Sequence, residues 1–243
     1  MRINKLLSNK GICSRKDAAR MIEEGRITVN GKQCIPGQWV EESDEILIDN
    51  EEIYDHEKVY LAFNKPRGIT CTAEKTVHNN IIDYISYGAY IFPIGRLDKE
   101  SQGLIILTND GDLANDILDS DNYHEKEYIV TLTEKYDDEF IERMSSGVNI
   151  NCGVTRKCIV KRVDDFTFKI ILTQGLNRQI RKMCRALGYT VDKLKRIRIL
   201  NIKIDNIEEG KWRYITEQEV SELRKLSQEK KDNINIYDLA FYI

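Results

Sequence analysis

From Val59 onward, short β-type runs alternate with helical patterns, and this mixed order limits the fold of the chain more than any other feature. It indicates an α+β domain with a mainly antiparallel sheet. The β-type runs are Val59–Phe63, Gly103–Leu107, Tyr128–Leu132, Cys158–Val163, Phe166–Leu172 and Ile197–Ile204. The helical patterns are Asp110–Leu118, Asp137–Ser145, Asn177–Leu187 and Glu217–Leu226, and Thr216 with Glu219 predicts a capping box for the last of them.

The first 50 residues follow a different pattern and indicate a separate small domain. Apolar periodicity predicts a helix that ends at Gly11, and Ser14 can cap a second helix. A β-type run at 26–29 leads into Asn30-Gly31, which is a strong hairpin signal, and 45–48 predicts another strand. We therefore expect a module at 1–50, a charged linker at 51–58, a larger domain at 59–228, and a tail at 229–243 to which we assign no role.

Charge is distributed unevenly along a chain whose formal net charge is −3. Residues 1–32 hold eight Lys or Arg against three acids, whereas residues 33–55 hold eight acids and no Lys or Arg. Residues 175–200 hold eight Lys or Arg against one acid. Separate basic segments in an acidic chain are typical of a protein that grips phosphate groups on particular faces, so RNA is the partner that the charge pattern favours.

Several classes of protein do not fit the sequence. No apolar run approaches the roughly 18 residues of a membrane span, and the first residues lack the apolar stretch of a secretory signal, so we expect a cytoplasmic protein with no membrane partner. The six cysteines form no Cys-x-x-Cys pair, and the three histidines are not spaced to join them as ligands. We therefore expect no metal, and buried, reduced thiols.

Three segments combine glycines, charges and apolar residues in a way that packing alone does not require. Residues 64–68, Asn-Lys-Pro-Arg-Gly, form a cationic loop that suits phosphate contact, with a solvated turn as the alternative. Residues 95–111 place Asp98 between a glycine turn and a fully apolar strand, so we expect its carboxylate at the edge of the core. In 175–185, Asn177 can cap a helix whose cations are Arg178, Arg181, Lys182 and Arg185.

Together these segments resemble the pseudouridine synthase family typified by RsuA, an enzyme of small-subunit ribosomal RNA. The resemblance rests on Gly-Arg-Leu-Asp, Ser-x-Gly-Leu and Thr-Asn-Asp-Gly within 95–111 and on Asn-Arg-Gln-Ile-Arg at 177–181. The phrases at 64–72, 124–128 and 174–181 look closest to the large-subunit subgroup of that family, called RluF. The first 50 residues are similar to the αL-type RNA-binding module known from a ribosomal protein of the small subunit.

The resemblance implies a reaction and its residues. It implies isomerisation of uridine to pseudouridine in ribosomal RNA, with 23S rRNA favoured and tRNA as the alternative, by a monomer that needs no cofactor. Asp98 matches the catalytic aspartate of the family, Tyr128 the tyrosine that stacks on the target base and removes a proton, and Arg181 the arginine that pairs with the aspartate. The uridine would be flipped out of its helix. Attack of the carboxylate at C1′ and removal of the C2′ proton stay open as alternatives.

Cations of the basic segments are the candidates for phosphate contact: Lys5, Arg15, Lys16, Arg20, Arg26, Lys65, Arg67, Arg96, Arg178 and Lys182. For Lys193, Lys195, Arg196 and Arg198, which alternate like an exposed strand face, contact with phosphate and simple solvation are equal alternatives. Two other functions are weighed. A non-catalytic RNA-binding assembly factor would have no use for Asp98, Tyr128 and Arg181, and a nucleoside hydrolase would require a metal or a second carboxylate that we do not find at motif spacing.

Overall fold

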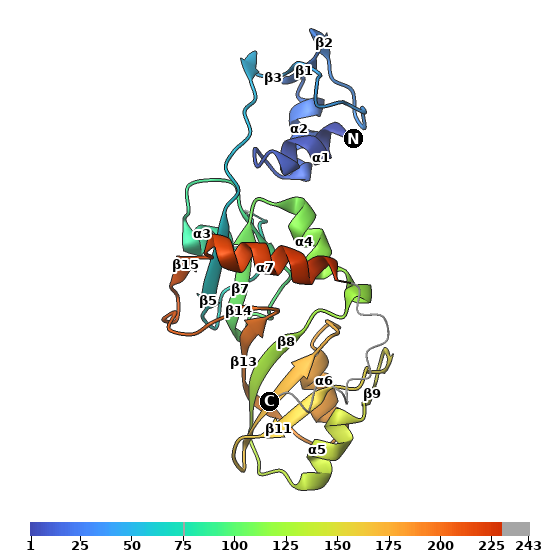
Figure 1. Cartoon of the computed structure of the whole chain (residues 1–243), viewed down its shortest axis with the longest axis vertical. Helices are drawn as coiled ribbons and strands as arrows, with labels where there is room; N and C mark the ends of the chain where they lie inside the picture. The colour runs from blue at the N-terminus through green and yellow to red at the C-terminus, as the bar shows by residue number, and fades with distance from the viewer. Residues whose placement is uncertain (75, 230–243) are drawn as a thin grey trace.

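In the computed structural model, which describes residues 1–74 and 76–229, the N-terminal module lies at one end of an elongated molecule (Figure 1). Its helices α1 (Ile3–Asn9) and α2 (Arg15–Glu23) share one hydrophobic core with a four-stranded sheet of order β2-β1-β3-β4. The strands are β1 (Ile27–Val29), β2 (Lys32–Gln33), β3 (Ile46–Ile48) and β4 (Glu51–Glu52). The module therefore has a core separate from that of the larger domain.

Local signals in the module have the structural roles expected of them. The Ser14 hydroxyl accepts a hydrogen bond from the backbone N–H of Asp17 at 3.0 Å and so caps α2. Asn30 and Gly31 both have positive φ, as the turn between β1 and β2 requires. Strand pairing continues through Glu51 and Glu52, because β4 pairs with β3, so the first two residues of the expected linker lie within this sheet.

The larger domain is built on a nine-stranded sheet in which β11-β12-β8-β13-β7-β5-β15 are neighbours, β14 pairs with β13 and β6 pairs with β7. All of these pairings are antiparallel except that of β13 with β7, which confirms the predicted α+β class. The strands are β5 (Tyr60–Lys65), β6 (Phe92–Ile94), β7 (Gln102–Thr108), β8 (Lys126–Leu132), β11 (Ile159–Arg162), β12 (Thr167–Leu172), β13 (Val191–Ile199), β14 (Ile202–Lys203) and β15 (Trp212–Tyr214). A separate hairpin joins β9 (Asn149–Ile150) and β10 (Gly153–Val154).

Helices cover both faces of the sheet. One core contains α4 (Gly111–Leu118) and α7 (Glu217–Gln228), which lie side by side in Figure 1. The other contains α3 (Ile81–Ile85), α5 (Asp138–Ser145) and α6 (Gln179–Ala186), and η1 (Ser120–Asn122) follows α4. Ile105 belongs to one core and its neighbours Leu104 and Ile106 to the other, which explains why β7 is apolar on both faces.

The sequence predictions for the main elements hold, with two corrections. Ile197–Ile204 is not one strand: β13 ends at Ile199, Leu200 has φ of +50°, and the chain turns back into β14. Asn177 does not cap α6, because the N-cap position is Arg178 in the left-handed conformation. The short elements that escaped prediction are β4, α3, β6, η1, β9, β10 and β15. Of the expected tail 229–243, all but Glu229 lies outside the described residues.

The Thr-Asn-Asp-Gly segment at 108–111 connects the module to the larger domain. The Asn109 side chain donates to the carbonyl of Glu57 and accepts from the N–H of Val59, each at 2.9 Å, and so holds the incoming chain from both sides. Asp112 accepts a hydrogen bond from Asn9 of α1 at 3.0 Å and forms an ion pair with Lys5 at 3.3 Å. The two domains are therefore joined by side-chain contacts as well as by the linker.

The cysteines follow the prediction of buried thiols except for Cys152, which is exposed in the turn between β9 and β10. Burial raises the pKa of Cys158 and of Cys184 to about 12, so both thiols stay protonated at neutral pH. Within residues 1–74 and 76–229, no three potential metal ligands of the His, Cys, Asp and Glu types gather in one place. No helix in that part of the chain is long and apolar enough to cross a membrane.

We predict that Glu219→Gln lowers the free energy of unfolding at pH 7 by about 1 kcal/mol, in the range of an exposed ion pair and a helix cap. The predicted capping box is present, and Arg213 donates twice to the Glu219 carboxylate, at 2.8 Å each. The hydrogen bonds from Arg213, and to a lesser degree those from Thr216, lower the pKa of Glu219 to about 2, although burial acts in the opposite direction. Because this folded-state pKa lies below the unfolded value of roughly 4.3, the stabilisation is present above pH ~4.3 and is lost as the pH falls toward about 2.

The measurement is urea unfolding at a series of pH values. The matched control is Glu217→Gln, which removes the same charge from the same helical turn where no ion pair forms among the described residues. Equal losses in the two variants, or a Glu219→Gln deficit that persists at pH 2, would contradict this role for the ion pair.

Candidate active site

Asp98 lies in the turn between β6 and β7, which we call the Asp98 turn (residues 95–101). Gly95 begins it with φ of +75°, and the N–H of Ser101 donates to the Asp98 carbonyl at 3.0 Å. The N–H of Gly68 donates to the Lys99 carbonyl at 2.8 Å, so the neighbouring loop holds the turn from outside. The Asp98 side chain is 26% exposed. Its carboxylate is thus at the edge of the core, as the sequence predicts.

Lys65 supports the Asp98 turn from below. It ends β5 and is fully buried, and its Nζ donates to the carbonyls of Ser101 and Pro66 at 2.8 Å each. Burial lowers the pKa of Lys65, and nearby groups including Cys71 and Asp98 partly oppose that shift. The prediction that Lys65 contacts RNA is therefore wrong, because the last residue of this strand points into the core rather than into the loop. Its ammonium group instead bonds to the backbone of the turn that carries Asp98.

The arginine paired with Asp98 differs from the one expected. Arg178 Nη1 lies 3.7 Å from an Asp98 carboxylate oxygen and 3.0 Å from one of Glu100. Arg178 has φ of +52° at the start of α6. The expected ion pair between Arg181 and Asp98 is not formed within 4.0 Å, because the Arg181 guanidinium donates instead to Ser101 Oγ at 3.5 Å and to the Val191 carbonyl at 3.2 Å.

Arg181 nevertheless belongs to the electrostatics of the site. Burial lowers its pKa, as does Arg178, whereas Asp98 and Glu100 raise it. Its Nε is buried and has no hydrogen-bond partner among the described residues. Arg181 follows Arg178 by three residues, about one helical turn along α6. Through its hydrogen bond to Ser101 it can orient the Asp98 turn.

A cavity of about 550 Å³, the central pocket, brings the candidate residues together. Asp98, Tyr128 and Arg178 line it, whereas Arg181 does not. Tyr128 comes from β8, where it pairs with Ile170 of β12 and Arg196 of β13, and only 9% of it is exposed. A pocket of this volume can accept a nucleotide, with an aromatic hydroxyl and a carboxylate in its walls.

Gly103 makes the position of the pocket wall possible. It has φ of +109°, and a Cβ built on it would lie 2.2 Å from the backbone oxygen of Arg196. At this residue β13 pairs in parallel with β7, directly after the Asp98 turn. The glycine of the Ser-x-Gly-Leu phrase is therefore required by a close approach of two backbones and not by chemistry.

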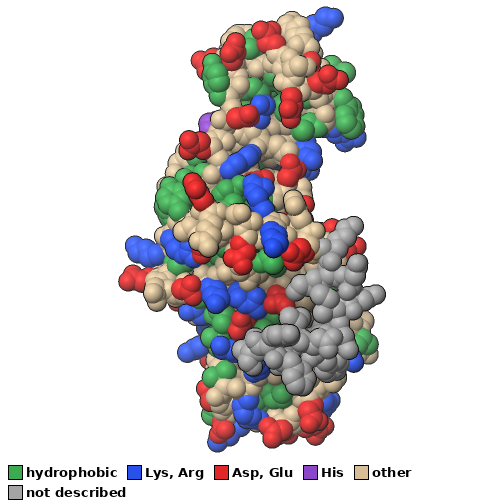
Figure 2. Space-filling view, viewed as in Figure 1, with side chains coloured by type: hydrophobic (Ala, Val, Ile, Leu, Met, Phe, Trp, Pro, Cys, Tyr) green, Lys and Arg blue, Asp and Glu red, His purple; other side chains and the backbone are tan. Residues whose placement is uncertain are grey.

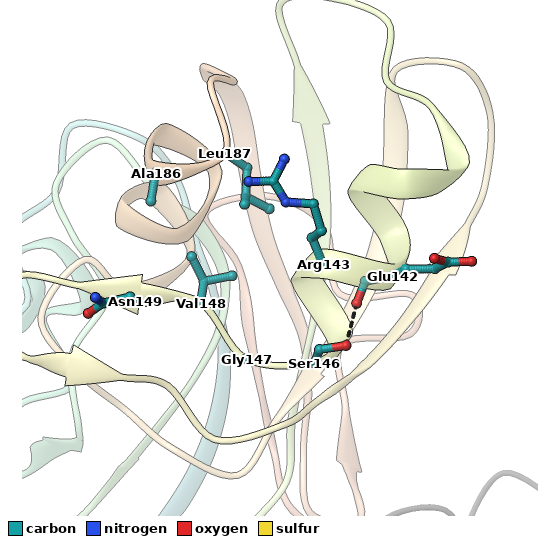
Figure 3. Close-up of a pocket in the computed structure, with 8 residues that line it drawn as sticks. All are labelled: Glu142, Arg143, Ser146, Gly147, Val148, Asn149, Ala186 and Leu187. Carbon is teal, nitrogen blue, oxygen red and sulfur yellow. Dashed lines mark hydrogen bonds between the residues drawn. The ribbon is translucent and has the colours of Figure 1, made fainter.

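A second hollow of about 460 Å³ lies between α5 and the end of α6 (Figure 3). Val148, Leu187 and Ala186 form its apolar part, and Arg143 reaches across it from α5. Glu142 provides the carboxylate among the residues that line the hollow, and its side chain points away from the hollow. The hollow shares no lining residue with the central pocket, and its hydroxyl group, that of Ser146, donates to the Glu142 carbonyl at 2.8 Å.

The other predicted RNA contacts of the larger domain lie around the rim of the pocket or close to it. Arg96 is exposed and lines the pocket. Arg67 is exposed, and its guanidinium donates to the Asp192 carbonyl. Lys182 is half-buried and donates to the Asn177 side chain at 3.5 Å.

The predicted cations of the module differ in how far acids already offset them. Arg26 donates to Asp49 with both Nε and Nη2, and Lys5 is paired with Asp112. Arg20 is exposed and pairs with Asp17 and Glu24. Lys16 pairs with Glu74 across the domain boundary, and Arg15 is exposed without an ion pair among the described residues. Acidic and basic side chains are intermixed over the face in Figure 2.

Two further cations line the central pocket: Lys126, which sequence reasoning did not single out, and Arg196, for which it left phosphate contact and solvation as equal alternatives. Arg196 was expected on an exposed strand face but is only 3% exposed, and Arg198 is paired with Glu125 and Glu127. Lys126 precedes Tyr128 by two residues on β8, so strand periodicity alone would have placed both side chains on one face. No sequence signal marked the burial of Arg196.

Comparison with known proteins agrees with this geometry. Residues 59–186 match the RNA pseudouridylate synthase family and residues 1–46 the S4 domain. The chain is 46% identical over 237 residues to the dual-specificity RNA pseudouridine synthase RluF of Escherichia coli K12, covering 96% of this chain and 82% of that protein. It is 30% identical to the ribosomal large subunit pseudouridine synthase B of Bacillus subtilis, covering 95% and 98%. A crystal structure of a pseudouridylate synthase superposes with a TM-score of 0.69 at 26% identity, covering 92% and 99%.

We predict that Gly103→Ala destabilises the protein by about 2 kcal/mol more than Gly153→Ala, since overpacking costs typically 1–3 kcal/mol. Both glycines have nearly the same φ, +109° and +105°, so the backbone strain is matched. Of these two glycines, Gly103 has backbone atoms closer than 3.0 Å to the added Cβ, whereas Gly153 faces open space. The measurement is chemical unfolding of both variants. Equal destabilisation would mean that β13 can move away from β7 at little cost.

Proposed function

Because the chain belongs to the RNA pseudouridylate synthase family, with an S4 domain ahead of the catalytic domain, we propose that it isomerises a uridine of ribosomal RNA to pseudouridine at Asp98. The observation that carries the proposal is the placement of Asp98 and Tyr128 in one pocket of nucleotide size, with Arg178 Nη1 at 3.7 Å from the carboxylate. The name of the B. subtilis relative supports 23S rRNA as the substrate. The dual-specificity name of the E. coli relative supports a second RNA, for which we expect tRNA.

The reaction breaks the N1–C1′ bond of uridine, turns the uracil and forms a C5–C1′ bond. N1 gains a proton and C5 loses one, so the product is an isomer and no electron carrier or water is consumed. The ionised Asp98 carboxylate serves the sugar, either by attack at C1′ or by removal of the C2′ proton. Arg178 Nη1 lies 3.7 Å from that carboxylate, and the Lys65 ammonium holds the backbone of the Asp98 turn through the Ser101 carbonyl. Tyr128 stacks on the uracil and takes part in removal of the C5 proton.

Arg181 has a positioning role in this proposal. Its hydrogen bond to Ser101 Oγ, and the fact that Ser101 lines the pocket whereas Arg181 does not, favour orientation of the Asp98 turn over contact with the base. Arg178 neutralises the carboxylate in the free protein, and its 42% exposed side chain can also reach an RNA phosphate at the rim. Arg67, Arg96 and Lys182 are placed to hold the phosphates around a flipped uridine.

A nucleoside hydrolase is less well supported. Such an enzyme would require a second carboxylate to activate water. Asp119 also lines the pocket, but its carboxylate accepts a hydrogen bond from the N–H of Asp121 at 3.0 Å as the cap of η1. We also keep the expectation of a cytoplasmic protein, because ribosomal RNA would be its substrate. The expectation of a monomer is kept as well.

We predict that mapping pseudouridines in ribosomal RNA finds a site that is present in cells with this chain and absent in cells without it. Asp98→Asn should fail to restore that site, because amide and carboxylate are nearly isosteric and only the charge serves the reaction. Asp119→Asn is the matched control: it makes the same change in the same pocket at a residue with a capping role. It should restore the site.

Three results would contradict the assignment. Modification by Asp98→Asn above a few per cent of wild type would remove Asp98 from the chemistry. Full complementation of ribosome assembly by Asp98→Asn with no site lost in the deletion would indicate a non-catalytic assembly factor. Loss of the base from the RNA, leaving an abasic nucleotide, would indicate a hydrolase.

We predict that Arg15→Ala reduces the slope of log affinity for ribosomal RNA against log salt concentration by roughly 0.7–0.9 in magnitude. This is the change expected when one phosphate contact is lost. Arg20→Ala should change the slope by less than half as much, because Arg20 is offset by Asp17 and Glu24 whereas Arg15 forms no ion pair among the described residues. Both lie on α2, so the pair is matched. The slope is measured by filter binding between 50 and 300 mM salt. An unchanged slope in Arg15→Ala would mean that this face of the module does not touch RNA.

A further inference from the structure

Strands β8 and β13 form part of the wall of the central pocket. The cation on one face of this pair of strands is bound to acidic side chains, whereas, within the part of the chain that the structure describes, the cations on the pocket face are not. On one face, Arg198 of β13 binds Glu127 at 2.9 Å and Glu125 at 3.0 Å. On the face that lines the pocket, Lys126 of β8 and Arg196 of β13 form no ion pair among the described residues. The outer face is therefore electrically balanced within the protein, and the pocket face is not.

Arg196 is held but not satisfied. It is 3% exposed, and its Nε donates to the Leu104 carbonyl at 2.7 Å, which fixes the guanidinium beside β7. Its Nη2 is buried and has no hydrogen-bond partner in the described part of the chain. A buried charged donor without an acceptor is costly, and a ligand that supplies the acceptor removes that cost.

Lys126 is in a similar state. Its Nζ has one long hydrogen bond, to the His124 carbonyl at 3.4 Å. Burial lowers its pKa to about 8, and the charge of Arg196 adds to the effect. The charged neighbour that acts on Lys126 is thus another cation, so the two side chains repel each other until an anion lies between them.

The position of this pair limits the identity of the anion. Lys126 and Arg196 line the same cavity as Asp98 and Tyr128, and Arg196 pairs with Tyr128 across the two strands. A molecule that places its base on Tyr128 and its sugar at Asp98 lies in the same cavity as the cationic pair, so its anionic part is within reach of that pair. Neutral carbonyl groups of uracil would leave the positive charges of the buried Arg196 and the half-buried Lys126 without compensation.

We propose that Lys126 and Arg196 form a subsite for a phosphodiester group of the RNA, located inside the pocket and distinct from the phosphate contacts at its rim. The inference rests on the proposed function for the identity of the bound nucleotide. The subsite fixes the backbone of the flipped nucleotide from within, so that the sugar is presented to Asp98 in one orientation. Gly103 is part of this device, because its lack of a side chain allows the backbone of Arg196 to approach β7.

The test compares uridine 3′,5′-bisphosphate with uridine as probes, using calorimetry on the wild type and on Lys126→Met. The bisphosphate should bind the wild type at least about ten-fold more tightly than uridine does, the value of one charge-assisted hydrogen bond. In Lys126→Met that difference should largely disappear, whereas Lys126→Arg should retain most of it. Lys193→Met, which removes an exposed charge from β13 outside the pocket lining, should behave as the wild type.

A second readout separates a ligand site from a structural role. Lys126→Met should unfold at the same temperature as the wild type or at a higher one, because it removes a half-buried cation that no acidic side chain of the described residues neutralises. Arg196→Gln is the companion variant; if it folds, it should lose the same preference for the bisphosphate. An undiminished preference of Lys126→Met for the bisphosphate would overturn the subsite, as would equal binding of both probes by the wild type; a lower unfolding temperature for Lys126→Met would indicate that the side chain has a structural role instead.

Binding of the probes requires no turnover, so failure of the subsite and failure of the proposed reaction are distinguishable. If the preference for the bisphosphate depends on Lys126 but the mapping finds no pseudouridine, the pocket binds nucleotides and the proposed chemistry is wrong. If pseudouridine forms normally with Lys126→Met, the phosphate subsite is wrong and the chemistry stands.

Discussion

The parallel pairing of β13 with β7 is the constraint on which the rest of the structure depends. In the order β11-β12-β8-β13-β7-β5-β15, this ladder joins two halves of the sheet. One half carries Tyr128 on β8, and the other contains β6 and β7, the strands on either side of the Asp98 turn. It is short, with register pairs at Lys195 with Gln102 and Arg196 with Gly103. The central pocket lies where the two halves meet. Two residues far apart along the chain thereby face one cavity, which is what a reaction at both the base and the sugar of one nucleotide requires.

Buried cations hold this junction together, and they differ in how they are satisfied. Lys65 bonds to the carbonyls of Ser101 and Pro66 and so has a complete structural role beneath the Asp98 turn. Arg196 bonds to one carbonyl of β7 and retains a buried donor without a partner. Since unsatisfied buried charge is unfavourable, the first arrangement is explained by the fold alone, whereas the second is explained by a ligand.

The same logic separates the phrases of the sequence that resemble the family. Asp98 lines the central pocket, Gly103 permits the approach of two strands, and Asn109 binds the linker through Glu57 and Val59. A phrase that is characteristic of a family thus contains a candidate catalytic residue, a packing requirement and a connection between domains. Only the first of these is expected to affect the chemical step directly.

The sequence by itself determined the α+β class, the separate N-terminal module, most helices and strands, and Asp98 as a carboxylate at the edge of the core. These follow from local periodicity, caps and turns, which depend on neighbours along the chain. It failed at Ile197–Ile204, because the reversal at Leu200 carries no glycine or proline, and it failed at Lys65 and Arg196, because the burial of a cation depends on strands distant in sequence. Only the tertiary structure decided that Arg178 rather than Arg181 contacts Asp98, and that two uncompensated cations share the pocket with Tyr128, since both results arise where β7, β13 and α6 meet in space.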